Sequence, residues 1–408
     1  MKESIRRMEE VLATMSAIGA DETGGLTRLL FDDSWKKAQE TFKDLFQGIG
    51  LESGYDQAGN MIGRIAGTEK PDEIVLTGSH VDTVRNGGAL DGQYGIIAGF
   101  LAIERLLEKY GRPAKTLAVV AFAEEEGSRF PYTFWGSKNL VGIADREEVR
   151  QLADAQGISF PEAMAKAGFD FDAARTAPMK NVVAFVEAHI EQGGVLEGLQ
   201  KQVGVVTAIA GQKRYTVTLT GEANHAGTTP MAMRRDAMEG AARCQVQLLD
   251  EAKRRGAPLV LTFGRVVPKP NIANVVPGEV VFTVDTRHVD ARALDDFGKL
   301  VERVICETAA SLNLTASVDP WMDEAPVPMD AKLTEALESR CRAMGMSFHT
   351  MHSGAGHDSQ ILAPFCPTAM LFVPSIKGIS HNPAENTKME DLVAGVDVLE
   401  AFLHDLAY

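Results

Sequence analysis

The sequence predicts an α/β fold in two domains, with a smaller α+β domain inserted into the larger one. Three observations predict it: a strand–helix–strand order near residue 74, alternating segments in the middle of the chain, and a buried strand near the C-terminus. A length of 408 residues suits two or three domains. We expect the larger domain at 1–208 and 326–408, and the insertion at 209–325.

The larger domain begins with a helical pattern and continues as a βαβ unit. Its first apolar residues recur at helical spacing: Ile5, Met8, Val11, Leu12 and Met15. The apolar runs 74–77 and 117–122 are typical of buried strands. Between them, segment 94–110 has helical spacing and ends before Gly111 and Pro113. Strands joined through a helix in this way are parallel.

The pattern changes at about residue 205. Segment 215–219 alternates strictly between apolar and polar residues, and segment 280–284 does so more loosely. Alternation indicates a sheet with one covered and one exposed face, which is typical of a smaller α+β domain. The prolines after Trp321 suggest a linker that returns to the larger domain, which resumes with a buried strand at 368–373.

The composition excludes several classes of protein. With 41 basic against 56 acidic residues, the net charge is -15, which disfavours nucleic acid and anionic membrane surfaces as partners. No apolar run approaches the roughly 20 residues that span a bilayer. The charged N-terminus lacks the apolar core of a signal peptide. Four scattered cysteines without C-x-x-C spacing favour a reducing, cytoplasmic location.

Candidate metal ligands follow the first strand of the βαβ unit. His80 and Asp82 are two residues apart on extended backbone, so their side chains point the same way. A carboxylate beside a ligating histidine orients its ring. Asp91 follows in the glycine-rich segment 87–92, which lacks the spacing of a phosphate or dinucleotide loop, so an oxidoreductase is disfavoured. By itself, His80 could equally be a hydrogen-bonded loop residue.

Further candidate ligands stand at other strand ends. The acidic triplet 124–126 follows the second strand, and like charges crowded there need a cation or must take up protons. His189 and His381 lie near two more strand ends, although each alone is more often structural. Together with His80 and Asp91 they form a set of imidazoles and carboxylates that suits Zn²⁺ or Mn²⁺. Such a set holds two metals when one carboxylate bridges them, about 3.5–4 Å apart.

These residues, in this order, resemble the binuclear M20 metallopeptidase and amidohydrolase family. The chain is most similar to the branch that hydrolyses carbamoyl and ureido groups, which includes N-carbamoyl-L-amino-acid hydrolases, β-ureidopropionases and the bacterial allantoate amidohydrolases. The similarity covers nearly the whole chain, through the segments 24–30, 124–130, 134–139, 224–231, 352–358 and 375–383. It implies an M20-like α/β metal-binding catalytic domain with an inserted α+β dimerisation or lid domain.

The resemblance implies a role for each candidate. Two divalent cations, Zn²⁺ or Mn²⁺, would be held by His80, Asp91, Glu126, His189 and His381, with Asp91 as the bridge. Asp82 would orient His80, and Glu125 would be the general base. The peptidase pattern would instead make Glu124 the general base and Glu125 the metal ligand. The Gly-x-Arg-Phe sequence that follows favours Glu125 and Glu126 for these two roles.

The resemblance also implies how the substrate is held. His225, in the insertion, would stabilise the oxyanion in the site of the partner subunit of a homodimer. An anionic substrate of an acidic protein needs guanidinium groups, so Arg287 would anchor its carboxylate and Arg214 is a second candidate. The other pocket candidates are Gln192, Asn274, Gly356 and His357. The alternative to a binding role is a structural one: Arg214 could lie on a solvated strand edge, and Asn274 could be a turn residue.

The implied function is hydrolysis of a ureido C–N bond of allantoate, giving ureidoglycine, ammonia and CO₂. N-carbamoyl-L-amino acids and ureidoglycolate are alternative substrates for the same residues. A non-catalytic, metal-stabilised binding protein is the remote alternative, and the intact Glu125 argues against it. Ser353 lacks the G-x-S-x-G context of a serine hydrolase.

Overall fold

The computed structural model describes residues 2–172 and 178–408. Residues 1 and 173–177, which fall in the expected segment 1–208, lie outside the described residues. The chain divides into a larger unit, Met1–Thr207 with Met329–Tyr408, and a smaller unit, Ala208–Pro328. No described helix is long and apolar enough to cross a lipid bilayer.

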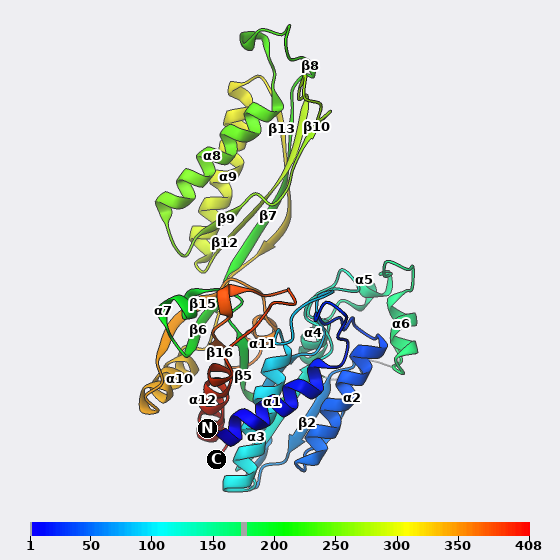
Figure 1. The fold of residues 1–408 in the computed structure, drawn as a ribbon, viewed down its shortest axis with the longest axis vertical. Helices are drawn as coiled ribbons and strands as arrows, with labels where there is room; N and C mark the ends of the chain where they lie inside the picture. Colours follow the sequence, from blue (N-terminus) through cyan, green and yellow to red (C-terminus); the bar gives the residue numbers. More distant parts are fainter. Residues whose placement is uncertain (1, 173–177) are drawn as a thin grey trace. The chain divides into compact units, whose positions relative to one another are not determined.

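A mixed sheet forms the centre of the larger unit (Figure 1). Its strands lie in the order β1 (Glu52–Tyr55), β2 (Met61–Ile65), β4 (Lys115–Phe122), β3 (Lys70–His80), β5 (Val182–Ile190), β16 (Thr368–Val373) and β6 (Val203–Ile209), and β15 (Phe348–Ser353) pairs with β6. Strand β3 is parallel to both β4 and β5, and β5 is parallel to β16. The predicted parallel sheet is therefore confirmed, with antiparallel strands β2 and β6 beside it.

Both faces of this sheet are covered, which explains why its central strands are apolar throughout. Alternate residues of β4 belong to two different hydrophobic clusters. Leu117, Val119 and Ala121 pack in the cluster that includes residues of four long helices. These helices are α1 (Lys2–Ser16), α2 (Asp33–Gly48), α3 (Gln93–Tyr110) and α12 (Met389–Ala407). Ala118, Val120 and Phe122 enter the other with residues of α4 (Trp135–Val141) and α11 (Asp358–Leu362). The remaining helices of this unit are α5 (Arg146–Arg150), α6 (Phe160–Lys166), α7 (Val195–Leu199), α10 (Ala331–Ala343) and the 3₁₀ turn η2 (Ile376–Gly378).

The smaller unit is an antiparallel sheet covered by a helix pair (Figure 1). The sheet order is β10 (Val266–Lys269), β12 (Glu279–His288), β7 (Gly211–Thr220) and β13 (Thr315–Glu324), with β9 (Val260–Thr262) also paired to β12. Every second residue of β7, from Tyr215 to Leu219, is buried against α8 (Ala237–Arg255) and α9 (Ala291–Ser311). The apolar residues of the predicted alternating strand therefore form the face of the sheet that the two helices cover.

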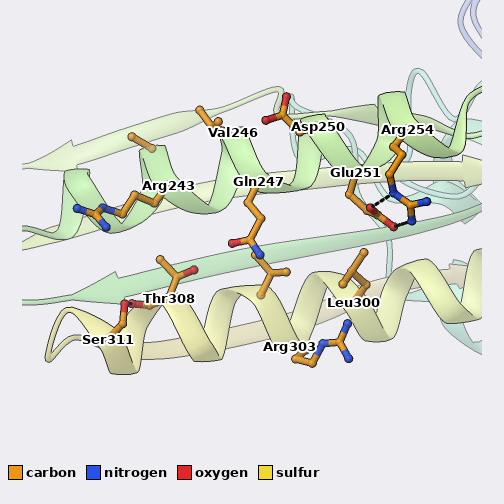
Figure 2. Close-up of a pocket in the computed structure, with 12 residues that line it drawn as sticks. Arg243, Val246, Gln247, Asp250, Glu251, Arg254, Leu300, Arg303, Thr308 and Ser311 are labelled. Atoms are coloured by element: carbon orange, nitrogen blue, oxygen red, sulfur yellow. Dashed lines mark hydrogen bonds and ion pairs between the residues drawn. The ribbon is translucent and has the colours of Figure 1, made fainter.

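Short elements complete the smaller unit. Strands β8 (Asn224–His225) and β11 (Val275–Val276) form a separate ladder, η1 (Met231–Met233) follows β8, and β14 (Val327–Pro328) pairs with the end of β6. Trp321 lies within β13 and not in the linker, because the sheet continues to residue 324. A groove of about 920 Å³ runs between α8 and α9, lined by Val246, Gln247, Leu300 and Arg303 among others (Figure 2).

A buried arginine ties the first helix to loops at the end of β3. The Arg28 guanidinium donates hydrogen bonds to the carbonyl oxygens of Met15 and Ile18, and to Gln93 Oε1 at 2.6 Å. Its backbone exchanges hydrogen bonds with Thr83, at 3.0 Å to the hydroxyl and 3.1 Å from the amide. Burial lowers the pKa of Arg28 to about 10, so the group stays charged at neutral pH.

We predict that Arg28→Met destabilises the larger unit by about 3 kcal/mol or more, because three buried acceptors lose their donor at about 1 kcal/mol or more each. The unfolding midpoint in urea measures the loss. Arg64→Met is the control: Arg64 is 56% exposed and pairs with Glu52 at the surface, so its loss costs less than about 1 kcal/mol. Equal midpoints for the two variants would contradict the anchoring role of Arg28.

Candidate metal centre

The predicted metal ligands gather at the carboxyl ends of the parallel strands of the larger unit, the edge where α/β sheets place ligands. His80 is the last residue of β3, and the acidic triplet 124–126 follows β4. His189 is the next-to-last residue of β5, near the strand end as expected. His381 lies in the loop after η2, and Asp91 in the turn before α3.

Asp91 lies at the centre of this set. Its Oδ1 is 3.3 Å from His189 Nε2 and 3.7 Å from His80 Nε2, and its Oδ2 is 3.1 Å from His381 Nε2. His381 Nε2 also lies 3.3 Å from Glu126 Oε1. Among the described residues, Asp91 is thus shared by the groups His80–Asp91–His189 and Asp91–Glu126–His381, each with ligand atoms within 4.8 Å. This arrangement suits two cations bridged by one carboxylate.

Protons on the imidazoles balance the carboxylate charge at the centre. Hydrogen bonds with Asp91 and Glu126 raise the pKa of His381 to about 11. Burial opposes protonation of His80 and His189, but hydrogen bonds with nearby aspartates outweigh it and raise the pKa of both. Burial likewise opposes ionisation of Asp91, yet the three imidazoles hold its pKa well below the usual value. The donor set therefore fits divalent cations, which supply the positive charge that these protons supply here.

Asp82 connects the loops after β3 and β4. Its carboxylate lies 3.3 Å from His80 Nδ1, and its backbone oxygen lies 3.0 Å from the same atom. The carboxylate also accepts hydrogen bonds from the amides of Glu125 at 3.0 Å and Glu126 at 3.1 Å. With Nδ1 directed at Asp82, Nε2 of His80 faces Asp91, where it is available to a cation.

The acidic triplet divides by contact. Glu126 approaches His381, whereas Glu125 groups with His80 and Glu126. Glu124 is fully buried, and burial together with neighbouring carboxylates raises its pKa well above the usual value. Burial also raises the pKa of Glu125 well above the usual value. The geometry favours the register in which Glu126 is the ligand.

A further group of candidate ligands contains Glu187, whose carboxylate already accepts hydrogen bonds from the protein. Glu187 and His357 have atoms within 4.8 Å of each other and of His189. The Glu187 carboxylate accepts hydrogen bonds from the Ser79 hydroxyl at 2.8 Å and from the Ser359 amide and hydroxyl at 2.9 and 2.6 Å. Glu187 therefore braces the end of β5 behind His189.

Ser353 and His357 form a buried pair, with Oγ 2.9 Å from Nε2. Burial and the neighbouring His189 lower the pKa of His357 well below the usual value, so its imidazole is neutral and a weak base. Its ring packs edge-on against His189, with centroids 4.4 Å apart. The pair supports the His189 ring, and a weakly basic His357 agrees with the weak sequence support for a serine nucleophile.

The other substrate-binding candidates of the larger unit are Gln192 and Gly356. Gln192 has a φ of 58°, and its Nε2 donates to Asp91 Oδ2 at 2.9 Å. Its Oε1 is buried and has no hydrogen-bond partner among the described residues. At Gly356 a Cβ would lie 2.9 Å from Gln360 Oε1 and 3.2 Å from Phe134, so a side chain there would displace the end of the Gln360 side chain.

In the smaller unit, His225 and Asn274 lie together. His225 is exposed in β8 and pairs with Val275, the residue after Asn274. Its Nδ1 accepts hydrogen bonds from the amides of Gly227 at 3.0 Å and Thr228 at 3.2 Å. Because Nδ1 is an acceptor, the neutral ring carries its proton on Nε2, which is free of these contacts.

The arginine candidates of the smaller unit share one carboxylate, that of Asp285. Arg287 donates to both its oxygens at 3.0 Å, and Arg214 Nε donates to Oδ2 at 2.8 Å. Arg214 lies in the interior strand β7 and not at a sheet edge, and it stacks on Trp321 with 5.4 Å to the ring centroid. Sequence reasoning missed Asp285, although period-two alternation places it on the face of Arg287.

The chain is similar to known amidohydrolases over its full length. The model of the family described as "Peptidase family M20/M25/M40" matches residues 76–405. Allantoate amidohydrolase of Escherichia coli K12 is 52% identical, with 98% of each chain covered. N-carbamoyl-L-amino acid amidohydrolase of Geobacillus stearothermophilus is 38% identical, again with 98% of each covered.

Solved structures agree with the sequence relatives. An amidase of the hydantoinase/carbamoylase family from Burkholderia multivorans has a TM-score of 0.93 at 34% identity, and the match covers 99% of this chain and 98% of the other. The fold, the family match and the relatives all assign the same group. The chain belongs to peptidase family M20/M25/M40.

Proposed function

We propose that the protein is an allantoate amidohydrolase, which hydrolyses one ureido C–N bond with water to give ureidoglycine, ammonia and CO₂. The observation that carries the reaction class is the pair of ligand groups that share Asp91. The choice of allantoate is supported by the 52% identity to the E. coli enzyme of that name over 404 residues. N-carbamoyl-L-amino acids remain the alternative, since relatives named for them are 38% identical or less.

The cofactor in this proposal is a pair of Zn²⁺ or Mn²⁺ ions, because imidazole and carboxylate ligands without thiolate suit both metals. His80 and His189 would hold one ion and Glu126 and His381 the other, with Asp91 between them. When bound, the ions polarise the ureido carbonyl and lower the pKa of the attacking water toward about 7.

The protein supplies the proton transfers and the oxyanion donor. Glu125 takes the proton of the attacking water and delivers it to the departing nitrogen. Asp82 keeps His80 oriented, at 3.3 Å from its Nδ1. His225 donates its Nε2 proton to the developing oxyanion, a role supported by the two amides that occupy Nδ1.

We assign substrate recognition to polar candidates of each unit. Arg287 anchors the allantoate carboxylate, and Asp285 holds its guanidinium in place beside Arg214. Gln192, whose Oε1 has no partner among the described residues, and Asn274 pair with ureido N–H and carbonyl groups. Gly356 and His357 line the pocket.

We further propose that segment 209–325 is a dimerisation and lid domain, and that His225 acts in the site of the partner subunit. Apolar exposure supports a homodimer: eight of the fourteen exposed large apolar side chains among the described residues lie in the smaller unit, which holds under a third of the chain. All four cysteines are described and form no disulfide, which suits the proposed cytoplasmic location.

The substrate assignment is tested by ammonia release from allantoate, ureidoglycolate and several N-carbamoyl-L-amino acids, with metal-loaded protein. We expect kcat/KM for allantoate to exceed the others by tenfold or more, since the substrate's second ureido group adds polar contacts in the transition state, each of about 1.4 kcal/mol or more. Fast hydrolysis of an N-carbamoyl amino acid with no ammonia from allantoate would instead assign the alternative.

Glu125→Gln should lower kcat by about 10²–10⁴, because an amide cannot take the proton of the attacking water. Metal analysis of the variant should still find two ions per chain, since the ligand groups are intact. Glu69→Gln, the same change at an exposed position, is the control and should retain full activity. A Glu125→Gln variant with wild-type turnover would eliminate the proposed base.

Arg287→Lys should raise KM for allantoate by about 10–100-fold, because a lysine cannot grip a carboxylate through two parallel hydrogen bonds. The control is Arg265→Lys, at an exposed position of the same unit. Steady-state kinetics over allantoate concentration separate KM from kcat. An unchanged KM would remove Arg287 from the carboxylate site.

A further inference from the structure

A glutamate outside the ligand set holds the turn that carries Asp91. Glu385 is 7% exposed, and its Oε1 accepts hydrogen bonds from the amides of Leu90 at 2.9 Å and Asp91 at 3.0 Å. A Cβ at Gly88 would lie 2.1 Å from this oxygen, so only glycine there allows the carboxylate to approach. One oxygen of Glu385 therefore fixes the backbone of the bridging aspartate.

The other oxygen of Glu385 holds the loop that carries His381. The Ser380 hydroxyl lies 2.9 Å from Glu385 Oε2 and 3.1 Å from Asp91 Oδ2. A tight turn brings Glu385 back to Ser380: its amide donates to Asn382 O at 2.9 Å, and Asn382 Oδ1 accepts the amide of Ala384 at 2.9 Å. Glu385 thus joins two loops that are almost 300 residues apart in the sequence.

His381 needs such support. Its side chain is half exposed, and its φ is 54°, a left-handed conformation that costs free energy for a residue with a Cβ. Surrounding packing cannot fix a half-exposed ring, so the loop backbone must do so. Ser380 directly precedes this strained position in the sequence, Glu385 follows it four residues later, and the two side chains are joined by a hydrogen bond.

Glu385 is not itself placed as a ligand. Its oxygens are taken by two backbone amides and one hydroxyl. Among the described residues it belongs to none of the groups whose ligand atoms converge within 4.8 Å. Its contacts are those of a residue that acts through Asp91 and Ser380.

We propose that Glu385 is a positioning residue for the cation site formed by Asp91, Glu126 and His381. Its two oxygens hold the bridging carboxylate and the His381 loop at a fixed separation, which sets the affinity of that site. The inference rests on the proposed pair of cations and is independent of the substrate. Hydrogen-bond partners of metal ligands typically contribute 10–100-fold to metal affinity.

The test is Zn²⁺ binding by metal-free protein, measured by competition with a chromophoric chelator. Glu385→Gln keeps an acceptor for the two amides but replaces Oε2 with an NH₂ group, which can only donate to the Ser380 oxygen, so the charged acceptor of the Ser380 proton is lost. We expect wild type to bind two ions per chain. We expect the variant to bind one ion with wild-type affinity and the second 10–100-fold more weakly.

Glu191→Gln is the matched control. Glu191 is 8% exposed, and its oxygens accept the amides of Val195 at 2.7 Å and Leu196 at 2.9 Å. The Glu191→Gln variant therefore loses a buried carboxylate that accepts two loop amides, as Glu385 does, but it leaves the Asp91 turn intact. Both ions should bind to Glu191→Gln with wild-type affinity, even where the thermal midpoint falls as much as in Glu385→Gln.

Ser380→Ala supplies a second route to the same result. It leaves Glu385 on the Asp91 turn and removes the link to Oε2, together with the contacts of the Ser380 hydroxyl to Asp91 Oδ2 and Gln192 Nε2, so the second ion should again bind more weakly. Because both changes remove the link between Ser380 and Glu385 Oε2, their effects should not add, and the double variant should bind no worse than Ser380→Ala alone. If Glu385→Gln does not fold, the affinity of Ser380→Ala decides.

Full-affinity binding of both ions by folded Glu385→Gln, or by Ser380→Ala, would overturn the positioning role. Wild-type protein that binds fewer than two ions would count against the proposed metal pair instead, so the two failures are distinguishable. Excess Zn²⁺ should refill the weakened site of Glu385→Gln, whereas a general folding defect would not respond to the metal.

Discussion

The larger unit is organised around the buried Asp91 carboxylate and the three imidazoles that face it. A carboxylate in this position is tolerable only with positive charge beside it, because burial alone would force it to take up a proton. His80, His189 and His381 come from three different segments, so their convergence requires each loop to be held independently. Much of the polar structure around the sheet edge serves that requirement.

The turn before α3 is held on two sides. Arg28 grips Gln93, whose Nε2 donates to the carbonyl of Ala89 at 2.6 Å, and Glu385 grips the amides of Leu90 and Asp91 from the other side. Gly92 completes the turn at a φ of 63°, and a Cβ there would lie 2.4 Å from the His80 ring. The N-terminal and C-terminal segments of the chain therefore both contribute to one carboxylate's position.

The elements that the sequence predicts well are those set by local periodicity. The helix expected at 94–110 is α3, and the strands expected at 117–122 and 368–373 are β4 and β16, because apolar spacing records which faces are buried. The ligand set was accessible for a related reason: parallel strands place their ends at one edge. Arg28, Asp285 and Glu385 were missed, and for Arg28 and Glu385 the reason is that their contacts join distant segments that leave no periodic signal. Asp285 did leave one, since it shares a strand face with Arg287.

The most direct test of a bridged cation pair is crystallography of Zn²⁺-loaded protein, with anomalous scattering recorded at the zinc edge. The account predicts two peaks about 3.5–4 Å apart, with Asp91 between them. His80 and His189 should flank one peak, and Glu126 and His381 the other. A single peak, or peaks that Asp91 does not contact, would contradict it.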